Sequence, residues 1–190
     1  MCNKSLINLH IISEPKKGRY VMDINPHIIA KAKDGDREAF GKLYESIAND
    51  LYKLALYMLG NKEDAEDAVS ETFIEAFKGI KNLRNDSSFK PWIMRILSIR
   101  CKRKIGGYVK EKTNVDIAEC LDISAQDNSE QTVMLWDALN SLSAEEREII
   151  ILSVVYGYKI KEISEIKDLP QGTVSSKIHR TMKKLQKLLS

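Results

Sequence analysis

Apolar side chains recur every three or four residues along most of this chain, which is the spacing of amphipathic helices. The clearest run lies between Arg37 and Leu59 and ends at Gly60, a residue type that often terminates helices. Its apolar positions are Phe40, Leu43, Tyr44, Ile47, Leu51, Leu54, Ala55 and Met58. No alternating run bounded by hairpin turns indicates a strand. The pattern predicts an all-α fold.

Two more helices are expected around this one. His27–Lys33 has the pattern of a short helix closed by Asp34-Gly35-Asp36. Asn61 is a suitable N-cap for a helix over Glu63–Ile80, whose first turns are rich in acidic residues, as the helix dipole favours.

A polar segment over Asn82–Ser88 predicts a loop after these helices. Ser88 can cap a following helix that passes through Trp92 and Ile96 to about Ile105. Trp92 lies four residues before Ile96, so we expect it in the core rather than as a stacking surface. The pair Gly106-Gly107 is expected to end this helix and the first domain.

The stretch Gly107–Ser129 is polar and acidic with little periodicity, which predicts a flexible linker with one weak helical turn over Val115–Leu121. We therefore divide the chain into an N-terminal extension, a first helical domain, a linker and a second helical domain. Their predicted boundaries are 1–26, 27–105, 106–130 and 131–190.

The second domain is predicted to be a four-helix unit. Glu130–Leu142 has a helical pattern, and Ser143-Ala-Glu-Glu146 is a capping box before a helix over Arg147–Tyr156. After Tyr158 the chain indicates helix, tight turn and helix, with Asp168, Pro170 and Gly172 breaking the pattern. The apolar positions of these last two helices are Ile160, Ile163 and Ile166, then Val174, Ile178, Met182, Leu185 and Leu189.

The other face of the last helix is basic, and no acidic residue occurs from Gln171 to Ser190. An exposed basic helix after a tight turn is the geometry that enters a DNA major groove. The simpler interpretation is a solvated helix whose lysines suit its C-terminal end. The polar positions of this face are Ser175, Ser176, Lys177, His179, Arg180, Lys183, Lys184 and Lys187.

The net charge of +3 conceals uneven blocks. Arg84–Lys112 is net +7, Thr113–Glu148 is net −8 and Ile149–Ser190 is net +5. Two basic segments around an acidic one predict two separate contacts with a polyanion.

Other chemistry finds little support in the sequence. The cysteines Cys2, Cys101 and Cys120 lack the paired spacing of a zinc site or a disulfide framework, which suits a reducing cytoplasm. No nucleophile–base pair, metal set or glycine-rich phosphate loop is visible, so we expect no cofactor and no catalysis. No apolar run approaches the length of a membrane span. Both Met1 and Met22 are candidate starts, because Lys16-Lys17-Gly18-Arg19 can be encoded by a purine-rich, ribosome-binding type of sequence.

Two groups of residues carry a resemblance to a known family. Asp64-Ala-Glu-Asp-Ala-Val-Ser-Glu-Thr-Phe-Ile-Glu-Ala-Phe77 and Phe89-Lys-Pro-Trp-Ile-Met-Arg-Ile96 resemble the second conserved region of bacterial sigma factors. Leu139-Asn-Ser-Leu-Ser-Ala-Glu-Glu-Arg-Glu148 and the Pro-Gln-Gly-Thr-Val turn resemble the fourth region. A short chain with these two regions alone is similar to the extracytoplasmic-function (ECF) group, over roughly His27–Ile105 and Gln131–Leu189.

The resemblance implies a subunit that binds core RNA polymerase, at its largest-subunit clamp helices and its flap, and recognises promoter DNA. Docking on the clamp helices would use Asp67, Ser70, Glu71 and Ile74. Recognition of the minus-ten element would use Asn82, Leu83, Arg84, Asn85 and Ser87, with Lys90, Arg95, Arg100, Lys102 and Arg103 holding the backbone. Recognition of the minus-thirty-five element would use Gly172, Ser175, Ser176, Lys177, His179, Arg180, Lys183 and Lys184.

The family also implies a cytoplasmic protein that is commonly silenced by an anti-sigma factor, often one in the membrane. Five family positions differ here. Ser70 stands where Gln is common, Ile99 where Asn is common and Ser175 where relatives often have Arg or Lys. Asp168 stands where the turn usually has glycine, and Lys159 replaces a common Ser or Thr cap. Aspartate tolerates left-handed geometry, so we expect the turn to form.

Two other interpretations of the residues stay open. The first is a transcriptional regulator that uses only the C-terminal helix-turn-helix. The second is an interaction protein that sequesters or recruits polymerase without reading DNA. The segment Glu63–Ile105 argues against the first, because a simple regulator has no need of an acidic docking helix followed by a polar loop and a basic helix. The basic helix Ser175–Lys187 argues against the second, which has no use for it.

Overall fold

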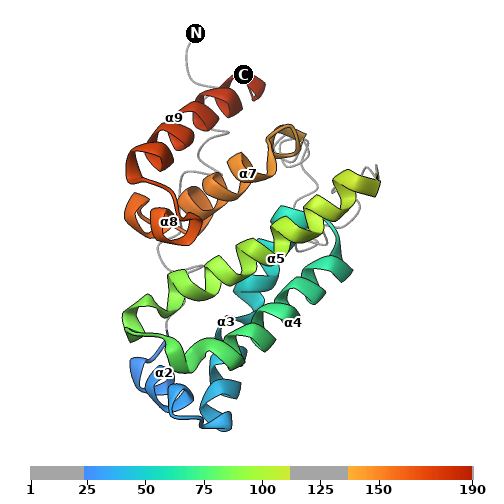
Figure 1. Ribbon diagram of the computed structural model, residues 1–190. Helices are drawn as coiled ribbons and strands as arrows, with labels where there is room; N and C mark the ends of the chain where they lie inside the picture. The colour runs from blue at the N-terminus through green and yellow to red at the C-terminus, as the bar shows by residue number, and fades with distance from the viewer. Residues whose placement is uncertain (1–23, 112–136, 190) are drawn as a thin grey trace, which may run out of the picture. The chain divides into compact units, whose positions relative to one another are not determined.

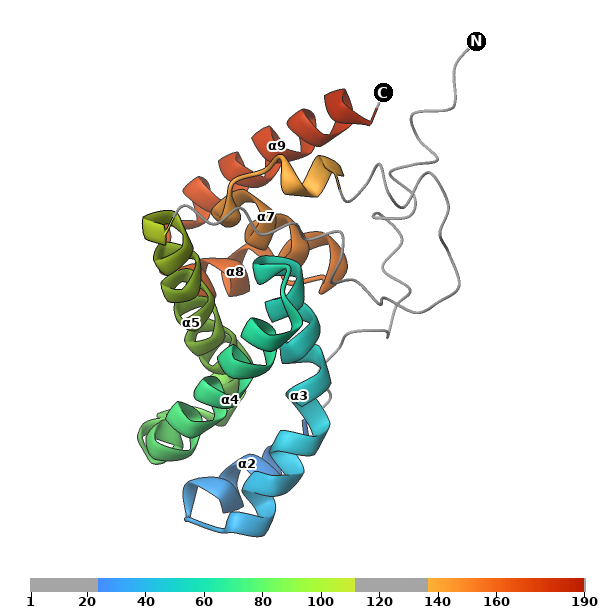
Figure 2. The same cartoon turned by 90° about the vertical axis from the view of Figure 1, so that its right-hand side faces the viewer.

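A computed structural model describes residues 24–111 and 137–189, and within these ranges all regular structure is helical (Figures 1 and 2). The chain forms two compact units. Of the described residues, 24–111 make up the body of one, and 137–164 with 168–189 that of the other. The prediction of an all-α protein with two helical domains is confirmed.

The N-terminal unit contains α2 (Pro26–Lys33), α3 (Arg37–Leu59), α4 (Lys62–Gly79) and α5 (Phe89–Glu111). Helix α3 packs against the other three, and α4 also packs along α5 (Figure 2). Aliphatic side chains fill the core between them, including the fully buried Leu43, Ile47, Leu51, Ile93 and Leu97. This burial of apolar surface is the main force that holds the unit together.

The predicted helix starts and stops of this unit are formed by specific caps. Asn61 Oδ1 accepts a hydrogen bond of 3.0 Å from the backbone N–H of Asp64, and Asp36 Oδ1 accepts one of 2.9 Å from that of Glu38. Gly60 ends α3 in the left-handed conformation, with φ of 67°. These contacts satisfy backbone groups that a helix end otherwise leaves unpaired.

Helix α5 is longer than the sequence predicts. The prediction that Gly106-Gly107 ends the helix near Ile105 was wrong, because α5 continues to Glu111. Each glycine costs a helix about 1 kcal/mol relative to alanine, but it keeps its N–H and does not clash as proline would. Residues 106–111, which we had assigned to the linker, are therefore helical.

The described part of the C-terminal unit starts with a helical turn over 137–140, and α7 (Ala144–Ile150) runs on into a π-helical segment, Ile151–Val155. Then come α8 (Ile160–Lys167) and α9 (Gln171–Leu188). A core cluster joins the 137–140 turn, α7 and α9. Its buried members are Ala138, Leu139, Leu142, Ile150, Leu185 and Leu189.

Several predictions fall on other parts of the chain. The linker from residue 112, its turn over Val115–Leu121, the start of the helix Glu130–Leu142 and both candidate translation starts lie outside the described residues. None of the described helices has the length and apolar character needed to cross a bilayer. Within the same residues, no group of His, Cys, Asp and Glu side chains is arranged to hold a metal ion.

Candidate nucleic-acid and protein interfaces

The turn between α8 and α9 adopts the geometry expected of a helix-turn-helix. Asp168 takes the left-handed conformation, with φ of 55° and ψ of 46°, and α9 begins after Pro170. Ile163 and Ile166 are buried as predicted, but Ile160 is 39% exposed. Ile160 lies about 120° around the helix from Ile166, at the edge of the apolar stripe.

Helix α9 presents the predicted polar residues on its exposed side. Val174, Thr181 and Leu185 are buried on its inner side, and Ile178 and Met182 are partly buried. Of the predicted minus-thirty-five residues, only Lys177 is half-buried. The exposed ones are Gly172, Ser175, Ser176, His179, Arg180, Lys183 and Lys184.

Two of these lysines are held by the capping-box segment, which sequence reasoning missed. Lys177 Nζ lies 2.8 Å from Glu145 Oε2, and Lys184 Nζ lies 3.6 Å from Glu146 Oε2. Lys184 also donates to the carbonyl oxygen of Ser141 at 3.2 Å. Both lysines therefore stabilise the packing of α9 on α7, and their charge is partly neutralised.

The backbone of α9 orients Arg180. Its Nε donates to the carbonyl oxygen of Ser176 at 3.3 Å, and Ser176 Oγ donates to that of Gly172 at 2.8 Å. No contact within the described residues is recorded for the two Nη groups of Arg180. A guanidinium in this position can make a bidentate contact with the O6 and N7 atoms of guanine.

The predicted protein-docking residues share the outer face of α4. Asp67, Ser70, Glu71 and Ile74 are all exposed, with Ile74 at 57%. Phe77 and Tyr44 beside this face are each 48% exposed. Sequence reasoning placed Tyr44 on the core face of its helix, but the structure leaves its ring at the surface, where its centroid lies 4.5 Å from that of Phe73.

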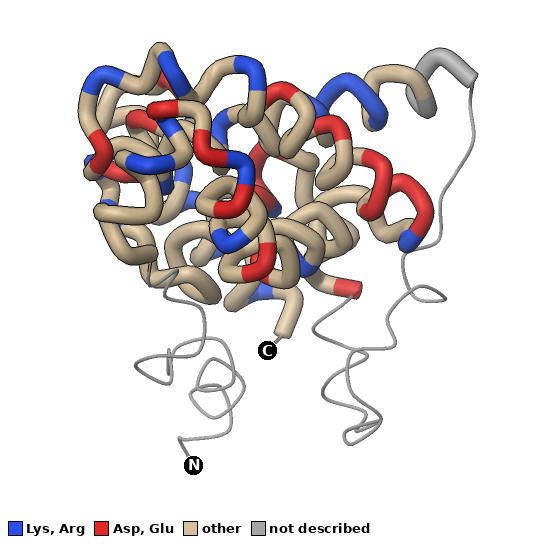
Figure 3. The backbone as a smooth tube through the Cα atoms, turned by 90° about the horizontal axis from the view of Figure 1, so that it is seen from below, with Lys and Arg blue, Asp and Glu red and all other residues tan. Residues whose placement is uncertain are grey.

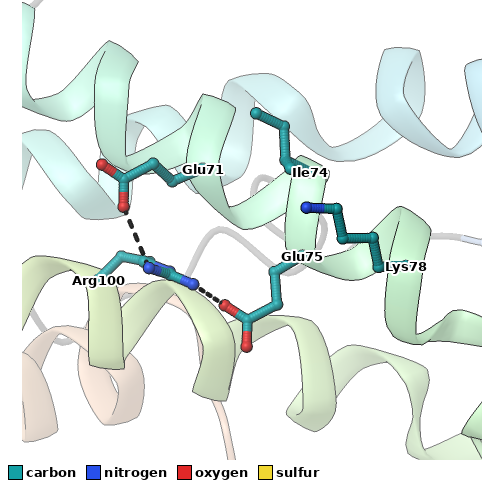
Figure 4. Close-up of a pocket in the computed structure, with 5 residues that line it drawn as sticks. All are labelled: Glu71, Ile74, Glu75, Lys78 and Arg100. Carbon is teal, nitrogen blue, oxygen red and sulfur yellow. Dashed lines mark hydrogen bonds and ion pairs between the residues drawn. The ribbon is translucent and has the colours of Figure 1, made fainter.

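Ion pairs join the acidic side of α4 to α5 (Figure 4). Arg100 Nη1 lies 3.4 Å from Glu71 Oε2, and Arg100 Nη2 donates to Glu75 Oε2. Lys104 Nζ lies 3.3 Å from Asp67 Oδ2 and 3.5 Å from Asp64 Oδ1. Glu71, Ile74, Glu75, Lys78 and Arg100 line an open hollow between these helices. The charged positions are marked along the backbone in Figure 3.

These contacts raise the pKa of both cations. The hydrogen bond to Glu75 is the largest influence on the pKa of Arg100. Burial alone would lower the pKa of Lys104, but hydrogen bonds and attraction from Asp67 and Asp64 outweigh it. The spacing of the acids in α4 and of the cations in α5 was visible in the sequence, but nothing there showed that the two rows face each other.

The segment before α5 consists of two short 3₁₀ turns, Ile80–Asn82 and Asp86–Ser88. Asn85 Oδ1 accepts a 3.0 Å hydrogen bond from the N–H of Ser87, and Lys33 Nζ pairs with Asp86 Oδ1 at 2.6 Å. Leu83 is only 8% exposed, so its side chain anchors the segment instead of lining a pocket. The predicted residues that remain exposed are Asn82, Arg84, Asn85 and Ser87.

The cations predicted to hold a DNA backbone are spread along α5. Lys102 and Arg103 are exposed, whereas Lys90, Arg95 and Arg100 are half-buried. Trp92 is also half-buried, and its ring centroid lies 5.9 Å from that of Phe89. The prediction that Trp92 lies in the core is therefore met only in part.

Two family models match the two units. The model of sigma-70 region 2 matches residues 43–107, and that of sigma-70 region 4 matches residues 132–185. Together they cover more than half of the chain. Because the first unit also matches a sigma-factor region, the match argues against a regulator that uses the helix-turn-helix alone.

Whole proteins of known identity are similar over most of their length. The ECF RNA polymerase sigma factor SigW of Bacillus subtilis is 31% identical over 178 residues, covering 85% of this chain and 94% of that protein. The ECF RNA polymerase sigma-E factor of Haemophilus influenzae is 26% identical over 174 residues, covering 84% and 92%.

Solved structures show the same fold. The sigma factor RpoE of Bartonella quintana, solved with the anti-sigma factor NepR, has a TM-score of 0.65 at 28% identity and covers 79% of this chain and 96% of its own. The structure of CnrH in complex with the cytosolic domain of CnrY has a TM-score of 0.67 at 22% identity. It covers 86% of this chain and 96% of its own.

The fold and the matched regions define a transcription initiation factor that binds RNA polymerase and DNA. The chain belongs to the ECF group of RNA polymerase sigma factors.

Proposed function

We propose that the two units divide the work of promoter recognition between them. In the N-terminal unit, Asp67, Ser70, Glu71 and Ile74 dock on the clamp helices of core polymerase. In the C-terminal unit, α9 lies in the major groove of the minus-thirty-five element. The observation that carries this proposal is that an exposed acidic face and an exposed acid-free basic face lie on different helices, α4 and α9.

The minus-ten element is assigned to the segment before α5 and to the start of that helix. Asn82, Arg84 and Ser87 are exposed next to a helix whose surface cations can hold phosphate. An unstacked base is bound by polar groups at its edge, and a single strand is held by basic side chains. Leu83 and Trp92 support this surface from within. Arg84, Asn85 and Ser87 are the residues we expect to contact a base.

Side chains of α9 have different tasks in this proposal. Arg180 reads a base, because its backbone contact at Ser176 uses Nε and leaves the two Nη groups for DNA. Lys183 binds phosphate, which adds affinity and salt dependence without specificity. Ser175, Ser176, His179 and Gly172 lie close to the groove floor or wall, and Lys177 and Lys184 keep α9 in place.

The chain supplies specificity, and the polymerase supplies the chemistry, so we assign no catalytic activity and no cofactor to the sigma factor itself. We place it in the cytoplasm, where core polymerase acts. An anti-sigma factor is the expected regulator. The complex of the Bartonella quintana relative with NepR supports this expectation.

Crossed variants test the division of work. Asp67→Ala combined with Glu71→Ala should weaken binding to core polymerase, and promoter binding by α9 should be unchanged. Arg180→Ala should leave core affinity unchanged and weaken promoter binding by about 1–3 kcal/mol. Glu66→Ala, another exposed acid of α4, is the control for charge. An equal loss of core polymerase binding and promoter binding in Arg180→Ala would contradict the proposal.

A further inference from the structure

Four carboxylates of α4 form a row that faces α5. They belong to Asp64, Asp67, Glu71 and Glu75, spaced three or four residues apart, and Lys104 and Arg100 lie against them. The side chains of Arg100 and Lys104 are only 22% and 19% exposed. Partly buried pairs are less screened by salt than pairs in open solvent.

The row joins residues of two proposed surfaces. Asp67 and Glu71 belong to the face proposed to dock on polymerase, and Arg100 belongs to the cations proposed to hold the DNA backbone. Both Nη groups of Arg100 are occupied by carboxylates in this structure. While these pairs persist, Arg100 cannot use the same groups to hold a phosphate.

Charge balance makes an exchange of partners favourable only when polymerase is present. Two cations against four carboxylates leave the row with an excess of negative charge. If Arg100 and Lys104 moved to a phosphate in the free protein, the four carboxylates would lose these partners and would repel the strand. Cations of a docked partner at Asp67 and Glu71 would remove that cost.

We propose that these ion pairs couple polymerase docking to the binding of single-stranded DNA, because the two cations exchange their carboxylate partners for phosphates. Docking takes Asp67 away from Lys104 and Glu71 away from Arg100, which leaves each cation with one carboxylate partner, Asp64 and Glu75. The two cations are then held less strongly and bind phosphates of the opened strand. Because coupling between binding sites is reciprocal, the bound strand strengthens docking by the same factor. This inference rests on the proposed function for the docking face.

The test uses the free full-length chain and a fluorescein-labelled oligothymidylate strand, which presents phosphates without promoter sequence. Glu75→Gln weakens the hold on Arg100, and Glu75 is not part of the docking face. Glu66→Gln is the matched control. It makes the same charge change on the same helix, at an exposed residue with no ion pair recorded in the described part of the chain.

Glu75→Gln should bind the strand about two- to fivefold more tightly than Glu66→Gln, as expected for the loss of one partly exposed ion pair. The slope of log affinity against log salt should steepen by about 0.7, the value for one further phosphate contact on a single strand. Adding Arg100→Gln to Glu75→Gln should abolish both gains. Equal thermal unfolding midpoints for Glu75→Gln and Glu66→Gln show that both variants are equally well folded when their affinities are compared.

Equal affinity and slope in Glu75→Gln and Glu66→Gln would overturn the exchange. Since this assay contains no polymerase, its failure is separate from a failure of the docking face, which the core affinity of Asp67→Ala with Glu71→Ala measures. In the presence of core polymerase, wild type and Glu75→Gln should bind the strand with equal affinity. A difference that persists unchanged overturns the coupling to docking.

Discussion

The indole of Trp92 lies directly over Gly79, and a Cβ atom built on that glycine would meet Trp92 Cζ2 at 3.2 Å. Gly79 is the last residue of α4, and Trp92 lies in the first turns of α5. The φ of Gly79, −98°, would suit any residue, so the limited space beside Trp92, and not the backbone conformation, favours glycine here. This contact fixes how the start of α5 sits on α4, and with it the polar segment between them.

Replacing Gly79 by alanine should therefore disturb Trp92. In a helix, alanine is normally more stable than glycine by about 1 kcal/mol, but forcing the indole to move costs about 1–3 kcal/mol. Gly41→Ala is the matched control, because its Cβ would meet nothing within 4 Å. Urea unfolding should show Gly41→Ala gaining stability and Gly79→Ala gaining none or losing some. Equal gains would mean that Trp92 adapts freely.

The emission of Trp92 gives a second readout of this contact. Trp136 is the other tryptophan of the chain, so the comparison is made in a Trp136→Phe background. Gly79→Ala should shift the emission maximum of Trp92, and Gly41→Ala should leave it unchanged. An unshifted maximum in Gly79→Ala would contradict the packing described here.

The left-handed Asp168 predicts how the helix-turn-helix tolerates substitution. Glycine removes the strain of a positive φ, so Asp168→Gly should keep or raise stability, by up to about 1 kcal/mol. Asp168→Val should lose about 1–2 kcal/mol, because a β-branched residue is least tolerant of this conformation. Thermal unfolding and duplex binding of both variants measure the effect. A valine variant as stable as wild type would show that the turn adopts another conformation.

The capping box of α7 predicts a component of acid sensitivity. Glu146 accepts hydrogen bonds of 2.9 Å from the N–H and from the hydroxyl of Ser143. The backbone hydrogen bond is the main cause that lowers the pKa of Glu146 below its ordinary value of 4.5. A depressed pKa contributes stability that is fully present above pH 4.5 and is lost as the pH falls through the folded-state value.

Glu146→Gln separates this titration from the cap itself, since glutamine also forms capping boxes. The free energy of unfolding of wild type should fall below pH 4.5 more steeply than that of Glu146→Gln. Ser143→Ala should cost about 1 kcal/mol at neutral pH, because the N-cap hydroxyl is lost. Parallel pH profiles for wild type and Glu146→Gln would show that this carboxylate does not contribute.

Lys183 and Lys177 should differ in their effect on DNA binding. Lys183 is exposed, whereas Lys177 is half-buried and paired with Glu145 at 2.8 Å. Lys183→Ala should reduce the slope of log affinity against log salt on duplex DNA by about 0.9, the value for one phosphate contact. Lys177→Ala should change the slope less and lower the stability of the C-terminal unit more. The opposite order would exchange the roles of the two lysines.

Local signals in the sequence predict the helices of this protein well. Asn61, Ser143 and Asp168 each stand at the cap or turn expected of them, since a cap depends on a few neighbouring residues. Gly106 misled the prediction of the end of α5, because a glycine weakens a helix without blocking it. Tyr44 and Ile160 have helical spacing, but they lie at the edges of their apolar stripes and stay exposed.

Contacts between helices could not be predicted in the same way. The sequence predicts a DNA contact for Arg100 and gives no sign of the ion pairs of Lys104, because the partners of both cations on α4 lie far away in the sequence. Lys177 and Lys184 likewise appeared to be free cations of a basic helix. Such pairs depend on how one helix is turned against another, which the period of each helix alone does not determine. The resemblance supplied the functions of these surfaces, and the structure showed which side chains are shared between them.

The central claim is that this chain gives promoter specificity to core polymerase. The most direct test is run-off transcription by purified core polymerase, with and without the protein, on genomic fragments that include the region upstream of its own gene. We predict a discrete start site that appears only with the wild-type protein and is lost or weakened with Arg180→Ala. No protein-dependent transcript from any fragment, despite measured binding to core polymerase, would contradict the claim and favour a protein that sequesters polymerase.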